Sequence, residues 1–401
     1  MEAEIEFIPS GTVTSPEGFQ AGATGAGIKK KDRLDLGILA SEVPGTAAAM
    51  FTTNRIKAAP IVFCQQRLGN NQAQAVVVNS GFANACTGKQ GLSDAAETAA
   101  AAAGVIGVSP EDVLVASTGV IGHRLPMERL RAGISQITLS RDGGQELARA
   151  IMTTDTVPKA AAVRTKGDGF TIGGIAKGSG MIHPDMATLL GFLTTDASVE
   201  ANFLKRALRN AVDVSFNMIS IDGDTSTNDM VLLMANGRAG GETISQGSGQ
   251  ADVFEQALNQ LCIHLAKSIA SDGEGATKLI QVTVNGAPGV AEARLAARTV
   301  VSSPLVKTAV HGNDPNWGRI LAAVGRSGVE VVETKIDLFL GSICLVKAGS
   351  PQPFNWEEAI KVLDEDEVAI VLNLNLGSGS ATAWGCDLSE EYVTINSQYT
   401  S

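Results

Sequence analysis

Aromatic residues are scarce in this chain, because Phe, Trp and Tyr together make up only 4% of its 401 residues. Its cores must therefore be built from Ala, Val, Ile and Leu. The five cysteines are odd in number and widely spaced, and no Cys-x-x-Cys pair occurs. This pattern argues against a disulfide framework or a zinc site, and we expect the cysteines to be small buried apolar residues. The four histidines show no His-x-x-x-His spacing, so no metal site is expected.

The chain also lacks an excess of positive charge. Lys and Arg number 31 against 42 Asp and Glu, a net charge of −11 that disfavours nucleic acid as a partner. The Ala-rich stretch from Thr98 to Val108 is shorter than the roughly 20 residues that a membrane-spanning helix needs. The segment Met1–Ile5 has neither the positive region nor the apolar region of a signal peptide. We therefore expect a cytoplasmic protein with no membrane contact.

Hydrophobic residues make up 44% of the chain and charged residues 18%, which is typical of a globular protein. The length predicts two or three packed units. Short Val- and Ile-rich runs predict strands, and amphipathic segments between them predict helices, so the expected class is α/β with mixed sheets. The predicted strands are Glu4–Ile8, Leu34–Ala40, Ala75–Asn79, Val113–Ala116, Thr171–Ile175, Met230–Met234, Leu279–Val284, Lys335–Leu340 and Val368–Leu374.

The predicted helices are Asp94–Ala103, Val199–Val212, Val253–Ala270, Val290–Val300 and Asn316–Val324. Ser198 is the expected N-cap of the second of them. A turn rich in glycine and acidic residues, Ser271–Gly275, follows a long predicted helix. We expect a domain boundary soon after it.

Three polar segments are candidate site regions. Ser117-Thr118-Gly119 follows a predicted strand, where the Thr118 hydroxyl and the Gly119 N–H could form an oxyanion hole, although such tripeptides are also common in turns. Lys177 could offer a charge to a carboxylate or could be a solvated loop lysine. Asp222–Asp229 resembles a calcium loop but lacks the required Gly and Glu, so we interpret it as a turn before strand Met230–Met234.

Thr188 stands near the middle of the chain, and no nucleophile–base pair is evident elsewhere. A threonine hydroxyl is a weak nucleophile unless a base is held against it. One solution uses the threonine's own α-amine as the base, which requires the threonine to be an N-terminus. Cleavage of the Ala187–Thr188 bond would create such a residue, so Thr188 is a candidate nucleophile.

These motifs together resemble one family, the ornithine acetyltransferases, also called glutamate N-acetyltransferases, of arginine biosynthesis. The resemblance covers essentially the whole chain, and so many matches in one order are far more specific than any single motif. The matching segments are Gly27–Lys29, Leu34–Leu36, Phe51–Arg55, Val78–Gly81, Ala83–Gly88, Ser117–Gly122, Thr153–Thr156, Pro158–Lys159, Asp222–Asp229, Asp314–Arg319 and Ala381–Leu388.

The resemblance implies a layered fold like that of ornithine acetyltransferases and aminopeptidases, with a smaller C-terminal α/β domain. It also implies self-cleavage between Ala187 and Thr188, after which an α chain and a β chain associate and assemble further. The implied segments are residues 1–187 (α chain), 188–275 (the catalytic part of the β chain) and 276–401 (a C-terminal domain whose tail reaches the active site).

The implied reaction moves an acetyl group from N-acetylornithine to Thr188 as an ester, with loss of ornithine, and then to the amine of glutamate. Thr118 and Gly119 match the family's oxyanion hole. The substrate-binding positions that match are Thr154, Lys177, Thr188, Glu274, Asn396 and Ser401. No cofactor is implied, and the sequence leaves open whether acetyl-CoA is a second donor. Phe82, His183, Asp185 and His311 depart from commoner choices without removing a proposed catalytic group.

Two other functions remain open from the sequence. The same fold could carry an N-terminal-nucleophile aminopeptidase or amidase that transfers the acyl group to water, and the pocket for an amine acceptor would distinguish the two enzymes. A binding or assembly protein without catalysis is the second alternative. Such a protein would stay intact, with no fragment beginning at Thr188.

Overall fold

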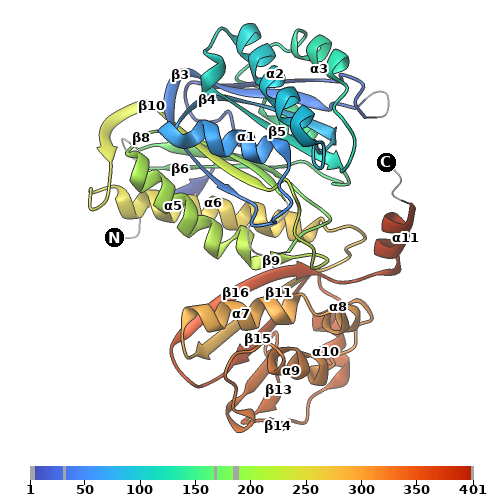
Figure 1. Cartoon of the computed structure of the whole chain (residues 1–401). Helices are drawn as coiled ribbons and strands as arrows, with labels where there is room; N and C mark the ends of the chain where they lie inside the picture. The colour runs from blue at the N-terminus through green and yellow to red at the C-terminus, as the bar shows by residue number, and fades with distance from the viewer. Residues whose placement is uncertain (1–4, 30–32, 167–168, 184–188, 399–401) are drawn as a thin grey trace.

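A computed structural model of the chain describes residues 5–29, 33–166, 169–183 and 189–398. In this part of the chain two mixed sheets are stacked with helical layers, and the smaller sheet lies at the bottom of Figure 1. The α/β class with mixed sheets is confirmed, because each sheet contains parallel and antiparallel neighbours.

The larger sheet has nine strands among the described residues, in the order β1-β6-β7-β8-β10-β3-β4-β5, with β2 paired to β3. Its strands are β1 (Ile5–Phe7), β2 (Phe19–Thr24), β3 (Leu36–Phe51), β4 (Gln72–Phe82), β5 (Val113–Val120), β6 (Lys159–Thr165), β7 (Thr171–Lys177), β8 (Leu190–Val199) and β10 (Met230–Ile244).

The second sheet has seven described strands in the order β14-β13-β12-β15-β11-β16-β9. These are β9 (Ile219–Ser220), β11 (Leu279–Ala287), β12 (Asp337–Leu340), β13 (Ile343–Lys347), β14 (Ser350–Pro351), β15 (Glu367–Asn373) and β16 (Gly379–Cys386). All but β9 come from the C-terminal segment of the chain. The two-residue strand β9 ties this sheet to the segment between β8 and β10.

Most of the described helices pack against the faces of the two sheets. They are α1 (Ala59–Arg67), α2 (Gly88–Ile106), α3 (Met127–Ile134), α4 (Gly144–Ala150), α5 (Ala201–Val214), α6 (Ala251–Ser271), α7 (Val290–Val301), α8 (Pro304–His311), α9 (Trp317–Gly325), α10 (Trp356–Leu363) and α11 (Glu390–Gln398). Short 3₁₀ turns are η1 (Leu68–Asn70), η2 (Pro110–Asp112), η3 (Phe216–Met218) and η4 (Glu333–Lys335).

Strand β10 illustrates that the larger sheet is buried on both faces. Its alternate residues enter different cores: Met230 and Leu232 pack toward α1 and α2, whereas Val231 and Leu233 pack toward α5 and α6. This is the period of two that a strand imposes. A strand covered on both sides reads as a continuous apolar run, which is why the sequence indicated a strand here.

Some sequence expectations require correction. Helix α5 begins at Ala201 rather than at Val199, and its cap is Glu200, whose carboxylate accepts hydrogen bonds from the Asn202 and Phe203 N–H groups at 2.9 Å. Ser198 lies in β8, because the strand continues until Val199 pairs with Ile244.

The cysteines follow the expectation only in part. Cys64, Cys262 and Cys386 are buried and Cys344 is partly buried, but Cys86 is exposed. Cys86 has a positive φ of 59° in the turn that precedes α2. Such a turn lies on the surface, which explains why this thiol is not in a core.

Among the described helices none is both long enough and apolar enough to cross a membrane.

Candidate active site

One cleft, open to solvent, brings together residues that are far apart in the sequence. The predicted site residues that line it are Thr118, Gly119, Thr154, Lys177, Glu274 and Asn396. The other predicted site residues, Ala187, Thr188 and Ser401, lie outside the described residues. The structure thus gathers in one place every predicted site residue that it describes.

Thr118 and Gly119 lie near the end of β5, where the parallel neighbour β4 places Gly81 opposite Gly119. Gly119 has a φ of +126°, which favours glycine. A Cβ atom at this position would lie 2.3 Å from the carbonyl carbon of Gly81, so no other residue fits without moving the backbone. The close approach of the two strands therefore holds the Thr118–Gly119 backbone rigidly in the wall of the cleft.

Asn228 links the segments that form this wall of the cleft. It was not recognised as a site residue from the sequence. Its buried amide group donates to the carbonyls of Ser117, at 2.8 Å, and of Ala83, at 2.6 Å. The Thr227 hydroxyl donates to its Oδ1 at 2.6 Å. The segment before β10, interpreted as a turn, consists of bends and irregular backbone, and its residues Ser226 and Asn228 line one side of the cleft.

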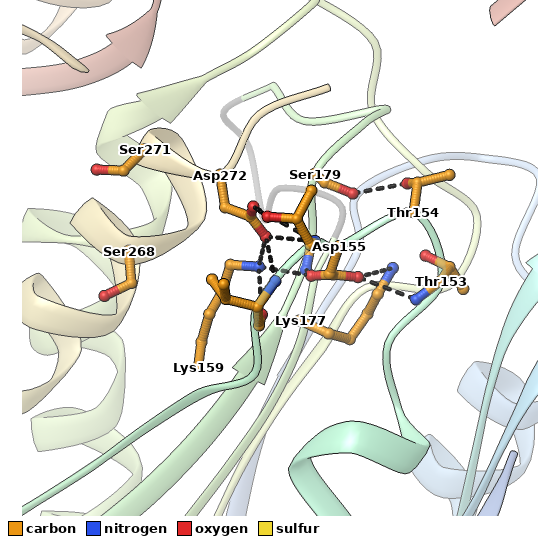
Figure 2. A network of polar contacts seen from close by, with 12 residues as sticks. Thr153, Thr154, Asp155, Lys159, Lys177, Ser179, Ser268, Ser271 and Asp272 are labelled. Carbon is orange, nitrogen blue, oxygen red and sulfur yellow. Dashed lines mark hydrogen bonds and ion pairs between the residues drawn. The ribbon is translucent and has the colours of Figure 1, made fainter. Parts of the chain in front are cut away.

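A buried network of charges lies beneath the cleft (Figure 2). The Lys159 ammonium lies 2.7 Å from Asp155 Oδ1 and 2.5 Å from Asp272 Oδ2. The Lys177 ammonium lies 4.0 Å from Asp155 Oδ2. Asp155 also accepts hydrogen bonds from the N–H groups of Thr153 and Gly178, at 3.0 and 2.7 Å. Asp155 therefore joins the two chain segments that carry Thr154 and Lys177.

The pKa values in this network follow from burial and charge. Burial alone would raise the pKa of Asp155, but Lys177 and Lys159 outweigh it and hold this pKa well below its usual range. Burial lowers the pKa of Lys177, a change that Asp155 opposes and Lys159 reinforces. Lys177 Nζ is 3.5 Å from the Thr118 hydroxyl oxygen. A lysine so placed can meet either a carboxylate or a polarised oxygen of a ligand.

The other end of the cleft is closed by the C-terminal part of the chain. Glu274 donates its N–H to the Ser179 carbonyl at 2.8 Å, and its Oε2 accepts a hydrogen bond from the Asn396 amide at 2.8 Å. The hydroxyls of Ser179 and Thr154 are hydrogen-bonded at 2.6 Å. Helix α11 thus places Asn396 in a cleft whose other lining residues come from earlier parts of the chain.

Asp155, Lys159 and Asp272 were not singled out individually as site residues from the sequence. The available signal was Lys159 directly before the apolar run Ala160–Val163, since a lysine in a buried segment requires a charged partner. Within the described residues, no cluster of three or more His, Cys, Asp or Glu side chains is arranged to hold a metal ion.

Replacing Asp155 by Asn should destabilise the fold by about 3–5 kcal/mol, because it leaves Lys159 with one fewer partner in a buried site. Urea unfolding followed by circular dichroism would measure the change. Glu367→Gln is the control, because Glu367 pairs with Lys267 at 2.9 Å on the surface and should matter little. Equal effects of the two substitutions would contradict the account of the network.

The same carboxylate should make stability depend on acid pH. Because the pKa of Asp155 is lower in the folded than in the unfolded protein, its contribution is complete above about pH 4 and declines as pH falls below that. The Asp155→Asn variant should lose less of its stability over this acid range than the parent protein does.

Known proteins are similar to this chain along its whole length. A family model described as the ArgJ family matches residues 20–401. The "Arginine biosynthesis bifunctional protein ArgJ" of Dehalococcoides mccartyi (strain CBDB1) is 53% identical over 405 residues, which span 100% of each protein. The protein of the same name from Symbiobacterium thermophilum is 54% identical over 396 residues, covering 97% of this chain and 98% of that protein.

A solved structure is also similar. The crystal structure of "Arginine biosynthesis bifunctional protein argJ" from Bacillus halodurans matches with a TM-score of 0.50 and 48% sequence identity. The match covers 97% of that crystallised chain but only 51% of this chain. The crystallised chain is therefore about half as long as the chain described here.

Proposed function

The chain belongs to the ArgJ family, and we propose that it transfers the acetyl group of N-acetylornithine to glutamate as an enzyme of arginine biosynthesis. The observation that carries the proposal is the cleft, which gathers the six described residues that the family resemblance assigned to oxyanion and substrate binding. The names of relatives with 53% and 54% identity support the pathway.

In this proposal the chain first cleaves itself. The Thr188 hydroxyl attacks the Ala187 carbonyl, the peptide C–N bond breaks, and an ester forms. Water then hydrolyses the ester, which leaves a carboxylate on Ala187 and a free amine on Thr188. The crystallised chain of the Bacillus halodurans relative covers only 51% of this chain. A mature enzyme made of two chains would give such a match.

The order of strands in the larger sheet explains how two cleaved chains would stay together. Strands β8 and β10 follow residue 188 in the sequence, yet they lie between β7 and β3, which precede it. Each is hydrogen-bonded on both sides over many residues. Cutting the chain before β8 therefore removes no strand pairing, and α and β chains of this enzyme would remain one folded body.

Transfer then proceeds in two steps. The Thr188 amine takes the proton of its own hydroxyl, and the oxygen attacks the acetyl carbonyl of N-acetylornithine. The Thr118 hydroxyl and the Gly119 N–H stabilise the negative charge on the carbonyl oxygen. The ammonium returns the proton to the leaving nitrogen, and ornithine departs. The amine of glutamate then attacks the carbonyl carbon of the acetyl ester and gives a proton to the Thr188 amine. The ester C–O bond breaks, the Thr188 oxygen takes that proton back, and N-acetylglutamate departs.

The charges of the cleft suit these substrates. N-acetylornithine and glutamate both carry an α-carboxylate, for which Lys177 offers a buried cation, and the Thr154 hydroxyl is a further donor. Ornithine adds a δ-ammonium, for which the half-buried Glu274 offers a carboxylate. Asn396 would hold Glu274 in place from α11.

The direct test is an assay with N-acetylornithine in the presence or absence of glutamate. We expect ornithine and N-acetylglutamate to form in equal amounts, with little acetate when glutamate is present. Acetate without N-acetylglutamate would indicate the amidase function instead. A parallel reaction with acetyl-CoA and glutamate tests a second donor, which the word "bifunctional" in the names of the relatives supports.

Thr188→Ala should give a single uncut chain with no measurable acetyl transfer, because it lacks both the attacking hydroxyl and the N-terminal amine. Mass spectrometry under denaturing conditions would detect the intact chain, whereas the parent protein should give two fragments, the second beginning at Thr188. Normal turnover by the variant would refute Thr188 as the nucleophile.

Thr118→Val should lower kcat by about 10²–10³-fold, because it removes one donor from the oxyanion hole while keeping the shape of the side chain. Thr118→Ser keeps the hydroxyl and is the matched control. The KM for N-acetylornithine should change little in either variant. A variant Thr118→Val with the kcat of the parent enzyme would exclude this hydroxyl from the oxyanion hole.

A further inference from the structure

Asp229 is a buried acid to which the proposed reaction assigns no part. Only 1% of the residue is exposed, and neither carboxylate oxygen reaches hydrogen-bond geometry with a partner among the described residues. The Thr52 hydroxyl, the Leu189 N–H and the Ser226 side chain lie near enough to lower its pKa without making well-formed bonds. A buried carboxylate without such bonds destabilises a fold. Its presence therefore points to a role other than stability.

The strand register places Asp229 level with Leu189, the residue that follows the proposed nucleophile in the sequence. Asp229 directly precedes β10, which runs parallel to β8 with Met230 opposite Leu190. The Met230 N–H donates to the Leu189 carbonyl at 3.1 Å, so Asp229 lies level with Leu189. Leu189 follows Thr188 directly, so an amine created at residue 188 belongs to the residue next to the one that Asp229 faces.

We propose that Asp229 is the positioning residue of the Thr188 amine: its carboxylate accepts a hydrogen bond from that amine and stabilises the ammonium formed during catalysis. The inference rests on the proposed function, because the amine exists only after cleavage. The proton moves from the Thr188 hydroxyl to the amine and then to the leaving nitrogen. Asp229 keeps its charge throughout, like the carboxylate that orients the base in a catalytic triad.

The charges around Asp229 agree with this role. Burial raises its pKa well above the usual range, and the Lys177 ammonium on β7 opposes that change. Lys177 itself is influenced by Asp155, Lys159 and Glu274, so it is shared among several acids. An ammonium at residue 188 would be a second cation beside Asp229 and would compensate its buried charge.

Asp229→Asn tests the inference in the mature enzyme. Self-cleavage should persist, because no amine takes part in it, whereas kcat should fall about 10²-fold with little change in the KM for N-acetylornithine. A carboxylate raises the pKa of a neighbouring amine, and this amine must be neutral to act as a base. Removing the carboxylate should therefore move the acid limb of the kcat/KM profile about one pH unit lower.

Two further variants control the experiment. Asp229→Glu keeps the carboxylate and should recover part of kcat and the acid limb of the parent enzyme. Asp196→Asn removes another buried carboxylate, at the far end of β8, where it accepts N–H groups of Glu17 and Thr171, and should leave the pH profile unchanged. Asp229→Asn should unfold at the same temperature as the parent protein or higher, since an amide is less costly to bury than a carboxylate.

Three results would overturn the inference: a variant Asp229→Asn that stays uncut, one that fails to fold, or one with the kcat and pH profile of the parent enzyme. The first would place the carboxylate in cleavage and the second in structure. Failure of the proposed function is recognised separately, because the parent protein itself would then neither cleave nor transfer acetyl groups.

Discussion

The insertion of β8 and β10 into the middle of the larger sheet is the constraint on which the rest of the structure depends. The two strands pair with each other and with β7 and β3 on either side, so strands from the two halves of the chain cannot separate without breaking two long ladders. The start of β8 is therefore fixed by pairing in the sheet and not by the peptide bond that precedes it. A protein built in this way can lose that bond and keep its site.

The charge network shows a second consequence of building a site between buried strands. Removing one partner of a buried ion pair costs about 3–5 kcal/mol, yet replacing the whole pair by apolar residues is often neutral, so such pairs are weak evidence for stability alone. Asp155 also accepts the N–H groups of Thr153 and Gly178, and so fixes the distance between the segments that carry Thr154 and Lys177. Its value to this protein is positional, because it joins two segments whose residues line the cleft.

Strands rich in Val, Ile and Leu, such as β11 and β15, could be predicted from the sequence because their composition matches their burial. Strand β6 could not, since Ala160–Ala162 give little β signal and only its neighbours in the sheet make it a strand. The site residues also differ in whether the sequence around them could predict them. Thr118 and Lys177 followed local patterns, whereas Thr154, Glu274 and Asn396 came only through the family resemblance. Their side chains meet through tertiary structure, and nothing in their local sequence indicates it.

Three buried carboxylates distinguish structure from function in this chain. Asp35 accepts the N–H groups of Ala26, Ile28 and Lys29 at 2.6–2.9 Å, so its charge is fully used in holding a loop. Asp155 is compensated by two lysines. Asp229 has no well-formed hydrogen bond among the described residues and yet is as deeply buried as either. An acid in that state opposes folding, and the role proposed above for Asp229 would explain its burial. The register of β8 and β10 sets Met230 opposite Leu190, so Asp229 stands where β8 begins, and in our proposal cleavage before β8 creates the amine that this acid binds.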